Sequence, residues 1–478
     1  MRVSLIPLVA AVLLAGCAGE PLALLPTPPL ATAFKEAPAP WVAAGPADAL
    51  PRTAWWTLYG DPELDALQQQ LLANSPDLAS ALARYQQARA ATDVVRSAQS
   101  PTVGASLGVE RDRQSEQRPL RVLGPQSPDE YNSATLGVSL QYELDLWGRV
   151  RQQVAAGIAQ EQAAQADLAG AQLSLQAQLA DTLIALRGLD QEVALLRETE
   201  AAYARSTKMI DQRHQVGIAS GLDLARAQTQ LESTRSLRQQ AEARRAVLEH
   251  AIAALVGANP STFLIEAKVV SGVIPVIPTG LPSTLLQRRP DIAAAQRRVV
   301  AANAGVGVAK TAFFPSLTLN AAGGYQSSDL GHFIAAPNLF WAIGPGLLVN
   351  LMDGGRRKAE VARAEAVLDE TGQNYRSLVL AAFQQVEDQL ALLNHYAAAA
   401  QSEAQATTAA QRAQALASNR YREGAVSYLD VVSAQTASLQ AQRSLLDLTT
   451  RQRRASIQLV RALGGGWSAD LIEAKTHE

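Results

Sequence analysis

The chain has 478 residues, of which 48% are hydrophobic but only 5% aromatic, and Ala, Leu and Gln dominate its composition. Such a composition favours long helices that pack closely through small side chains over a thick globular core. The 42 basic and 44 acidic residues give a formal net charge of -2. This balance offers no basic field, so we exclude nucleic acid as a partner.

Residues 1–16 have the features of a secretory signal peptide. Arg2 supplies the charged start, and the apolar run from Leu5 to Ala15 is too short to span a bilayer. The protein is therefore expected to leave the cytoplasm.

The apolar run ends at Cys17, the only cysteine in the chain, so a disulfide within one chain is excluded. Leu14-Ala15-Gly16-Cys17 resembles a bacterial lipobox, which implies that Cys17 becomes an acylated N-terminus. The implied covalent groups are a diacylglycerol and an N-acyl chain such as palmitate, with no other cofactor. Ala18 fits sorting to the outer membrane. The alternative is ordinary signal cleavage near Ala18, with an incidental thiol.

Residues 17–51 are predicted to form a lipidated tether between the lipid and the folded body. This segment is rich in Pro and Ala, and proline disfavours both helix and sheet. Its prolines are Pro21, Pro26, Pro28, Pro29, Pro38, Pro40, Pro46 and Pro51.

The rest of the chain contains one unit twice. The run Gln215–Asp223 recurs 207 residues later at Arg422–Asp430, and Ala227–Thr229 recurs at Ala434–Thr436 with the same offset. Repetition with a fixed long period indicates tandem structural repeats. We assign residues 52–260 to the first repeat, 261–282 to a linker, 283–466 to the second repeat and 467–478 to a C-terminal tail.

Each repeat is predicted to contain two very long helices. No proline occurs between Pro128 and Pro260 or after Pro345, so both stretches lack the strongest helix breaker. A helix of this length would extend roughly 100 Å and must lie along others in a coiled coil or bundle. The expected helices span about 149–214 and 221–256 in the first repeat, and about 355–421 and 428–462 in the second.

Two strands precede the long helices of each repeat. Leu136, Val138 and Leu140 alternate with polar residues or Gly. Alternating strands of about ten residues between turn-rich segments are typical of a transmembrane barrel. The alternative is a soluble sandwich with one buried face. The expected strands span about 102–112, 134–147, 315–326 and 340–352.

Four strands cannot close a barrel, and open edges are not tolerated in lipid, so several chains must share one sheet. The second face of the strands carries Gly, Ser, Thr, Gln, Glu and Asp. Such a lining suits water, which favours about twelve strands from three chains over a filled eight-stranded barrel. The expected fold class is mainly α with a transmembrane β-barrel, in a trimer whose barrel continues into a periplasmic helical barrel.

Over residues 52–466 the chain resembles the outer-membrane factor family, the TolC-like and OprM-like efflux ducts, and within it the NodT-type lipoprotein branch. The resemblance lies in the duplicated Gly-x-x-Ser-x-Leu-Asp reversals and in the run Leu281–Ile292. It implies a homotrimer in the outer membrane, an equatorial belt that includes the linker, and helices that extend into the periplasm.

The same resemblance implies a passive gated duct that exports small molecules, such as drugs or other toxic compounds, and so contributes to antibiotic resistance. The implied partners are an inner-membrane transporter of the RND type, a periplasmic adaptor and outer-membrane lipid.

The helix reversals hold the candidate site residues. Gly217 and Gly424 are placed as C-terminal caps, and Ser220 with Asp223, like Ser427 with Asp430, matches a capping box.

By resemblance, Asp430 and Tyr421 match the aspartate and tyrosine that narrow the periplasmic aperture. Gating and simple capping stay open for Asp430, as do capping and a direct pore role for Asp223. Val426 stands where some relatives carry an arginine.

The reversals also resemble the tips that meet the adaptor. The matching residues are Val216, Gly217, Ile218, Gly424 and Ala425. Glu423 departs from the commoner valine, so the second contact is expected to differ.

We expect no catalysis and no metal site. The five histidines are scattered without ligand spacing, and no thiol remains for catalysis if Cys17 is acylated. Two other readings stay open: a lipoprotein spacer that ties the outer membrane to the cell wall, and a secreted hydrolase, for which no nucleophile and base arrangement is visible.

Overall fold

The computed structural model describes residues 34–36, 54–115, 130–269, 274, 275, 277 and 288–466. The signal peptide, Cys17, most of the tether, part of the linker and the C-terminal tail lie outside these residues. The chain divides into two compact units. We call residues 86–163 and 295–374 the strand unit, and residues 27–85, 164–294 and 375–478 the helical unit.

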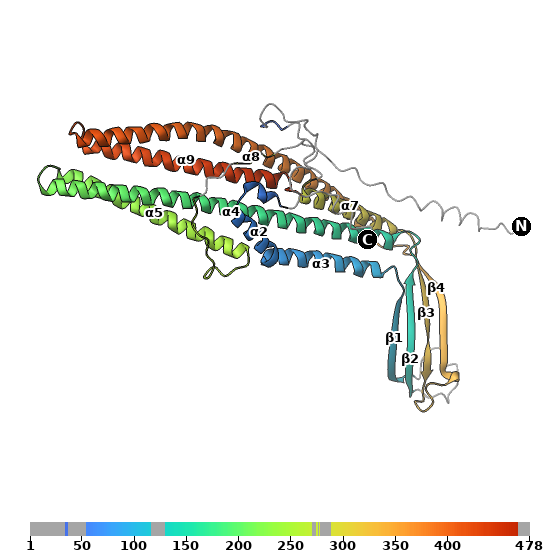
Figure 1. The fold of residues 1–478 in the computed structure, drawn as a ribbon. Helices are drawn as coiled ribbons and strands as arrows, with labels where there is room; N and C mark the ends of the chain where they lie inside the picture. Colours follow the sequence, from blue (N-terminus) through green and yellow to red (C-terminus); the bar gives the residue numbers. More distant parts are fainter. Residues whose placement is uncertain are drawn as a thin grey trace. The chain divides into compact units, whose positions relative to one another are not determined.

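The strand unit contains one antiparallel sheet in the order β1-β2-β3-β4, as Figure 1 shows. The strands are β1 (Thr102–Arg113), β2 (Glu130–Glu143), β3 (Ser316–Ser327) and β4 (Leu339–Leu348). The helices α3 (Pro76–Ser97) and α7 (Pro290–Thr311) precede the first strand of each repeat.

The register of the sheet places most of the large apolar side chains of the four strands on one face. Leu107 faces Leu136, which faces Tyr325, which in turn faces Leu339. Large apolar side chains on this face are exposed, including Trp341 (75%) and Leu107 (71%). The opposite face carries mostly small and polar residues, namely Gly104, Ser106, Gly137, Ser139, Gln141, Asn320, Ala322, Gly324 and Gly344, together with the larger Tyr131, Phe340 and Leu348.

Two strands end earlier than their alternation predicted, at Glu143 and Leu348 rather than near residues 147 and 352. An aspartate follows each strand and binds the first turn of the long helix after it. Asp145 accepts the N–H groups of Val150 and Arg151 at 3.0 and 2.9 Å. Asp353 likewise accepts the N–H groups of Gly355 and Arg357. Residues 144–147 and 349–352, which alternation assigned to the strands, therefore connect strand to helix and belong to neither element.

The long helices are α4 (Arg149–Gln215) and α5 (Gly221–Leu255) in the first repeat, and α8 (Arg356–Arg422) and α9 (Tyr428–Ala462) in the second. At 67 residues each, α4 and α8 are about 100 Å long. A mainly helical chain with a strand sheet, in which each of two tandem repeats gives two strands and two very long helices, is thus confirmed.

The core of the helical unit forms where the 3₁₀ helix η2 (Trp55–Tyr59) and α2 (Pro62–Asn74) lie against α4, α5 and α9. Trp55, Leu71 and Leu183 are almost completely buried there. Beside it, buried Arg187 pairs with Asp190 at 3.0 Å and with Glu63 of α2. Such buried charges are tolerated because each is paired and hydrogen-bonded.

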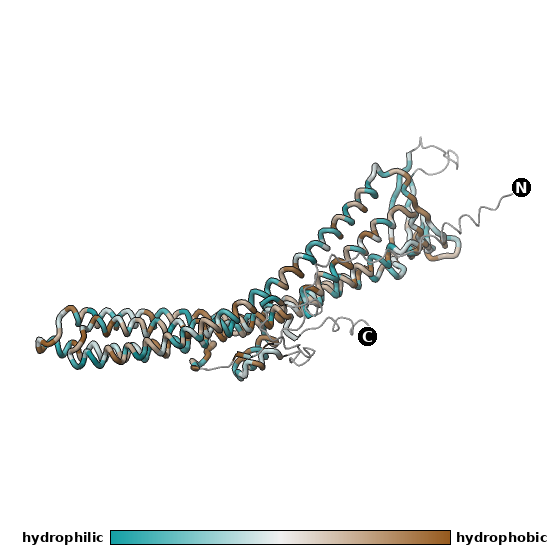
Figure 2. Tube along the Cα trace, turned by 90° about the horizontal axis from the view of Figure 1, so that it is seen from above, coloured by the Kyte–Doolittle hydropathy of each residue, from teal (hydrophilic) through white to brown (hydrophobic). Residues whose placement is uncertain are grey.

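Hydrophobic and hydrophilic residues are mixed along the long helices in Figure 2. Among the described residues, no helix has the length and apolar composition needed to cross a bilayer.

Gly257 follows the end of α5 and lies against Asn74 at the end of α2, so replacing it tests this contact between the two helices. Gly60 is the control. Both adopt positive φ, but a Cβ on Gly257 would lie 2.3 Å from the Asn74 carbonyl oxygen, whereas one on Gly60 would meet nothing within 4 Å. Gly60→Ala should cost about 1 kcal/mol from backbone strain alone. Gly257→Ala should cost more, because the end of α2 must also move. Urea unfolding followed by circular dichroism measures both, and equal losses would contradict the proposed contact.

Candidate functional site

The two helix reversals have the same backbone geometry. Gly217 and Gly424 adopt φ values of 76° and 77°, in the left-handed region that favours glycine. The N–H of Ile218 donates to the Arg213 carbonyl, and the N–H of Ala425 donates to the Arg420 carbonyl. Together with the bonds made by the two glycines, these close a Schellman motif at the end of α4 and of α8.

The reversals pack against each other within the helical unit. Ile210, Ala227, Tyr428 and Val431 form a buried apolar cluster between the two helix pairs. Tyr421 packs against this cluster, and the centre of its ring lies 5.3 Å from that of Tyr428. The structure thus brings Tyr421 together with residues of the first reversal.

Two polar contacts connect the reversals across the same cluster. The Arg213 guanidinium of α4 lies over the Tyr421 ring at 5.7 Å from its centre, within the range of a cation–π interaction. The hydroxyls of Ser206 and Tyr428 lie 3.5 Å apart. Burial raises the pKa of the Tyr428 phenol, while the bond to Ser206 opposes this shift, so the phenol stays neutral.

Asp430 caps its own helix and stays accessible to solvent. One carboxylate oxygen accepts the backbone N–H of Ser427 at 3.0 Å and the Ser427 hydroxyl at 2.7 Å. The residue is nevertheless exposed. Asp430 can therefore stabilise the start of α9 and still present a negative charge.

Asp223 has a different environment at the equivalent position. The Ser220 hydroxyl accepts the backbone N–H of Asp223 at 3.1 Å. The Asp223 carboxylate pairs with Arg226 of the next turn at 3.5 Å. A cation therefore stands beside the acidic group of the first reversal, whereas the Asp430 carboxylate accepts hydrogen bonds from the neutral Ser427.

The tip residues expose apolar surface. Val216 and Ile218 are 70% and 74% exposed, and Gly217, Gly424 and Ala425 are exposed too. At the equivalent positions of the second tip, Glu423 and Ala425 replace Val216 and Ile218, so the two tips present different surfaces.

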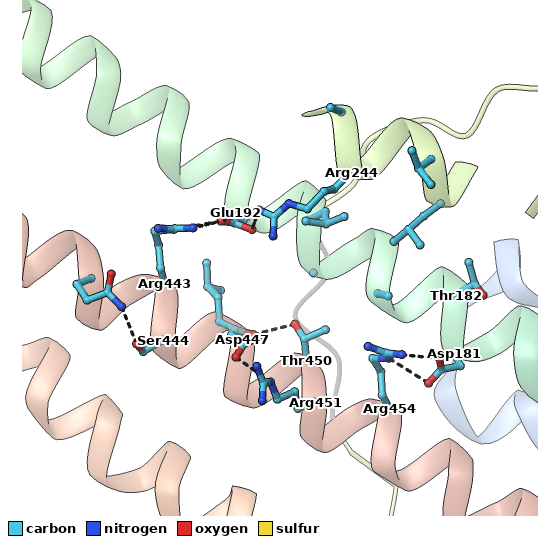
Figure 3. Close-up of a pocket in the computed structure, with 18 residues that line it drawn as sticks. Asp181, Thr182, Glu192, Arg244, Arg443, Ser444, Asp447, Thr450, Arg451 and Arg454 are labelled. Carbon is cyan, nitrogen blue, oxygen red and sulfur yellow. Dashed lines mark hydrogen bonds and ion pairs between the residues drawn. The ribbon is translucent and has the colours of Figure 1, made fainter. Parts of the chain in front are cut away.

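A cavity of about 800 Å³ is lined by residues of α4, α5 and α9 (Figure 3). At its centre, Glu192 of α4 accepts from Arg244 of α5 at 3.1 Å and from Arg443 of α9 at 2.7 Å. Asp181 of α4 accepts from Arg454 of α9 at 2.8 Å. These ion pairs join the three helices around the cavity.

Sequence reasoning missed Arg213, Tyr428 and Glu192. Tyr428 has a visible signal, since the first repeat carries Gly221 at the equivalent position and a bulky replacement indicates a contact peculiar to one repeat. Arg213 and Glu192 lie among many charged helix residues and have no such signal. Among the described residues, no group of three or more His, Cys, Asp or Glu side chains could hold a metal ion.

Glu192 and Asp447 allow a test of the inter-helix ion pairs. Glu192 joins three helices, whereas Asp447 pairs with Arg451 of its own helix at 2.8 Å. Glu192→Gln should lower the free energy of unfolding by about 1–2 kcal/mol, since two arginines lose their partner. Asp447→Asn should change it by less than about 0.5 kcal/mol, because its pair is exposed. Urea unfolding of both variants is the measurement, and equal effects would remove Glu192 from this role.

Comparison with known proteins gives a consistent result. The family model described as outer membrane efflux protein matches residues 67–258 and 281–465, which correspond to the two repeats. The pyoverdine export outer membrane protein OpmQ of Pseudomonas aeruginosa is 31% identical, over 98% of each chain. The toluene efflux pump outer membrane protein TtgC of Pseudomonas putida is 32% identical, over 96% of this chain and 94% of its own.

A solved structure agrees with these relatives. The open state of the MtrE outer membrane channel of Neisseria gonorrhoeae matches 95% of this chain and 99% of its own, with a TM-score of 0.82 and 26% identity. The protein is therefore an outer-membrane channel rather than an enzyme, and it belongs to the outer membrane efflux protein family.

Proposed function

We propose that three copies of the chain form one passive, gated duct, through which small molecules pass from an inner-membrane pump to the outside. The supporting observation is the sheet, whose four strands share one apolar face. Within the described residues, β1 and β4 pair on one side only. Lipid does not tolerate such open edges, so further copies must complete the sheet. The small and polar second face suits a water-filled barrel of about twelve strands.

A lipid on Cys17 is part of this proposal. The lipobox-like run before Cys17 supports acylation of this residue with a diacylglycerol and an N-acyl chain. The tether then runs from the membrane to the folded body.

The proposed partners are a periplasmic adaptor and an inner-membrane transporter of the RND type. The names of two relatives mention pyoverdine and toluene, which differ strongly in polarity. These two relatives, which are about equally identical to this chain, are thus named for chemically unlike cargoes. This supports a duct for small molecules in which the pump selects the cargo.

Asp430 and Tyr421 are the proposed gate. Asp430 is exposed beside the second reversal, and three copies on one axis would form an acidic ring that attracts cations. Tyr421, near the end of α8, packs on Tyr428, and this contact fixes the position of the helix end. Ser220 and Ser427 are the proposed helix caps, whereas the Asp223 carboxylate pairs with Arg226.

Conductance in planar bilayers tests the duct and the gate. The wild type should give small currents that divalent cations block. Asp430→Asn removes the charge but keeps an acceptor for the Ser427 N–H, whereas Asp430→Ala also loses the cap and about 1 kcal/mol of stability. Both variants should lose the cation block, because the charge and not the cap attracts the cation.

Asp223→Asn is the matched control, since Arg226 already lies beside that carboxylate. It should leave the cation block intact. A block that persists in Asp430→Asn and Asp430→Ala would reduce Asp430 to a cap. The absence of channels from verified trimers would contradict the duct itself.

The exposed tips are proposed to contact the adaptor, and Ile218→Asp tests this. A charge at Ile218 should abolish pump-dependent efflux by breaking an apolar contact, without unfolding, because the side chain is 74% exposed. Val94→Asp on α3 is the control, at a side chain that is 72% exposed. Drug susceptibility of cells with equal trimer levels is the readout, and intact efflux with Ile218→Asp would contradict the contact. Gly217→Trp is a poorer test, since positive φ strains any side chain there.

A further inference from the structure

The cavity in Figure 3 has apolar walls as well as charged residues. Its volume of about 800 Å³ lies within the roughly 300–1,000 Å³ that is usual for ligand pockets. The small residues Gly188 of α4 and Ala243 of α5 leave space between the helices. Leu189, Val247 and Leu446 supply apolar surface. The cavity is therefore large enough for a drug-sized molecule and can bury an apolar part of it.

Positive charge exceeds negative charge around the cavity. Glu192 is the common partner of Arg244 and Arg443, which reach it from opposite sides in Figure 3. The other two arginines of the lining each pair with one carboxylate, namely Arg451 with Asp447 and Arg454 with Asp181. Four arginines thus face three carboxylates, and the excess positive charge lies at Arg244 and Arg443.

These two arginines have N–H groups left for a ligand. A guanidinium carries five N–H donors in a planar fork, which suits the oxygens of an anionic group. In the described part of the chain, Arg244 donates to Glu192 through Nη2 alone, and its side chain is 56% exposed. Arg443 donates to the same carboxylate through Nε and Nη2, which leaves its Nη1 group. An anion can therefore bind both arginines while Glu192 stays in place.

The cavity opens on the opposite side of the helices from η2 and the linker. Each residue turns an α-helix by about 100°, so residues two positions apart point in roughly opposite directions. Each of the three helices has such a pair, of which the first member lines the cavity: Glu192 and Asp190 on α4, Val247 and Glu249 on α5, and Arg454 and Ser456 on α9. Asp190 and Glu249 accept backbone N–H groups of the linker, and Ser456 bonds to Tyr59 of η2. In the proposed duct the linker belongs to a belt around the tube, so the cavity faces the lumen.

We propose that this cavity is a binding site for an organic anion with an apolar body, such as an aromatic sulfonate or carboxylate, on its way through the duct. The anionic group binds Arg244 and Arg443, and the apolar body lies against Val247 and Leu446. The place of the site in the lumen rests on the proposed function, whereas binding itself does not. A single excess charge keeps the binding weak enough for release, which passage through a channel requires.

The acidic residues of the proposed gate do not cancel this attraction. Arg443 follows Asp430 by 13 residues on α9, which is about 20 Å along the helix. At physiological ionic strength, charges in water are screened over about 8 Å. An anion at the cavity therefore experiences the nearby arginines and not the gate.

Binding of naphthalene-1-sulfonate to the full-length protein in phosphatidylcholine nanodiscs tests the proposal. Equilibrium dialysis measures the dissociation constant, and nanodiscs without protein give the blank. The matched probe is 1-naphthylmethylammonium, which has the same ring but the opposite charge. It should bind at least about tenfold more weakly than the sulfonate, because the excess charge of the cavity is positive.

Three variants assign the binding to the cavity. Arg244→Gln should weaken sulfonate binding about tenfold, since a charge-assisted hydrogen bond is lost. Glu192→Gln should strengthen it about tenfold, because the competing carboxylate is removed. Val247→Trp should weaken the binding of both probes by filling the apolar part. The control is Arg197→Gln, whose 63% exposed arginine also joins α4 to α5 through an ion pair but does not line the cavity. It should leave the affinity unchanged.

The gain of affinity in Glu192→Gln separates a binding site from a purely structural set of ion pairs, which predicts no gain. Equal affinity for the two probes, or sulfonate binding that Arg244→Gln or Val247→Trp leaves unchanged, would overturn the proposal. A protein that conducts in planar bilayers but does not bind the sulfonate would remove the cavity site and leave the duct intact. Verified trimers that bind the sulfonate without conducting would contradict the duct alone.

Discussion

The lateral packing of the long helices is the interaction on which the rest of the structure depends. A helix of 67 residues has no core of its own, so its stability comes from its neighbours. Gly188 permits the closest approach of α4 to α9, since a Cβ there would lie 2.6 Å from the Thr450 hydroxyl oxygen. The ion pairs of Asp181 and Glu192 with α9 flank this contact. The buried cluster between the reversals then fixes where Tyr421 lies.

Much of this architecture could be predicted from the sequence, because the signals were local. The absence of proline indicated the long helices, Gly217 and Gly424 marked their ends, and alternation indicated the strands. The strand ends could not be read in the same way, because residues 144–147 and 349–352 continue the apolar alternation but connect strand to helix. The contact of Arg213 with Tyr421 was also out of reach, since it depends on how two helix pairs pack and not on any spacing along the chain.

Repetition preserves the elements but not the contacts. Gly188 of the first repeat corresponds to the exposed His395 of the second, so the close contact that Gly188 makes with Thr450 has no equivalent on α8. Gly221 corresponds to Tyr428, which is buried between the reversals. Arg187 corresponds to Asn394, and both bind a carbonyl oxygen from a segment outside the helix pair. Divergence of this kind gives one chain two unlike tips.

The strand sheet also decides between a duct and a lipoprotein spacer. A spacer needs long helices but has no use for a sheet with a small and polar second face. Large side chains such as Trp341, Ile343 and Leu107 are more than 60% exposed on the other face, and each would gain roughly 1.5–3 kcal/mol on burial. An outer membrane supplies that burial, whereas the long helices carry exposed charged residues suited to water. One chain thus meets two solvents, which a membrane duct requires and a periplasmic spacer does not.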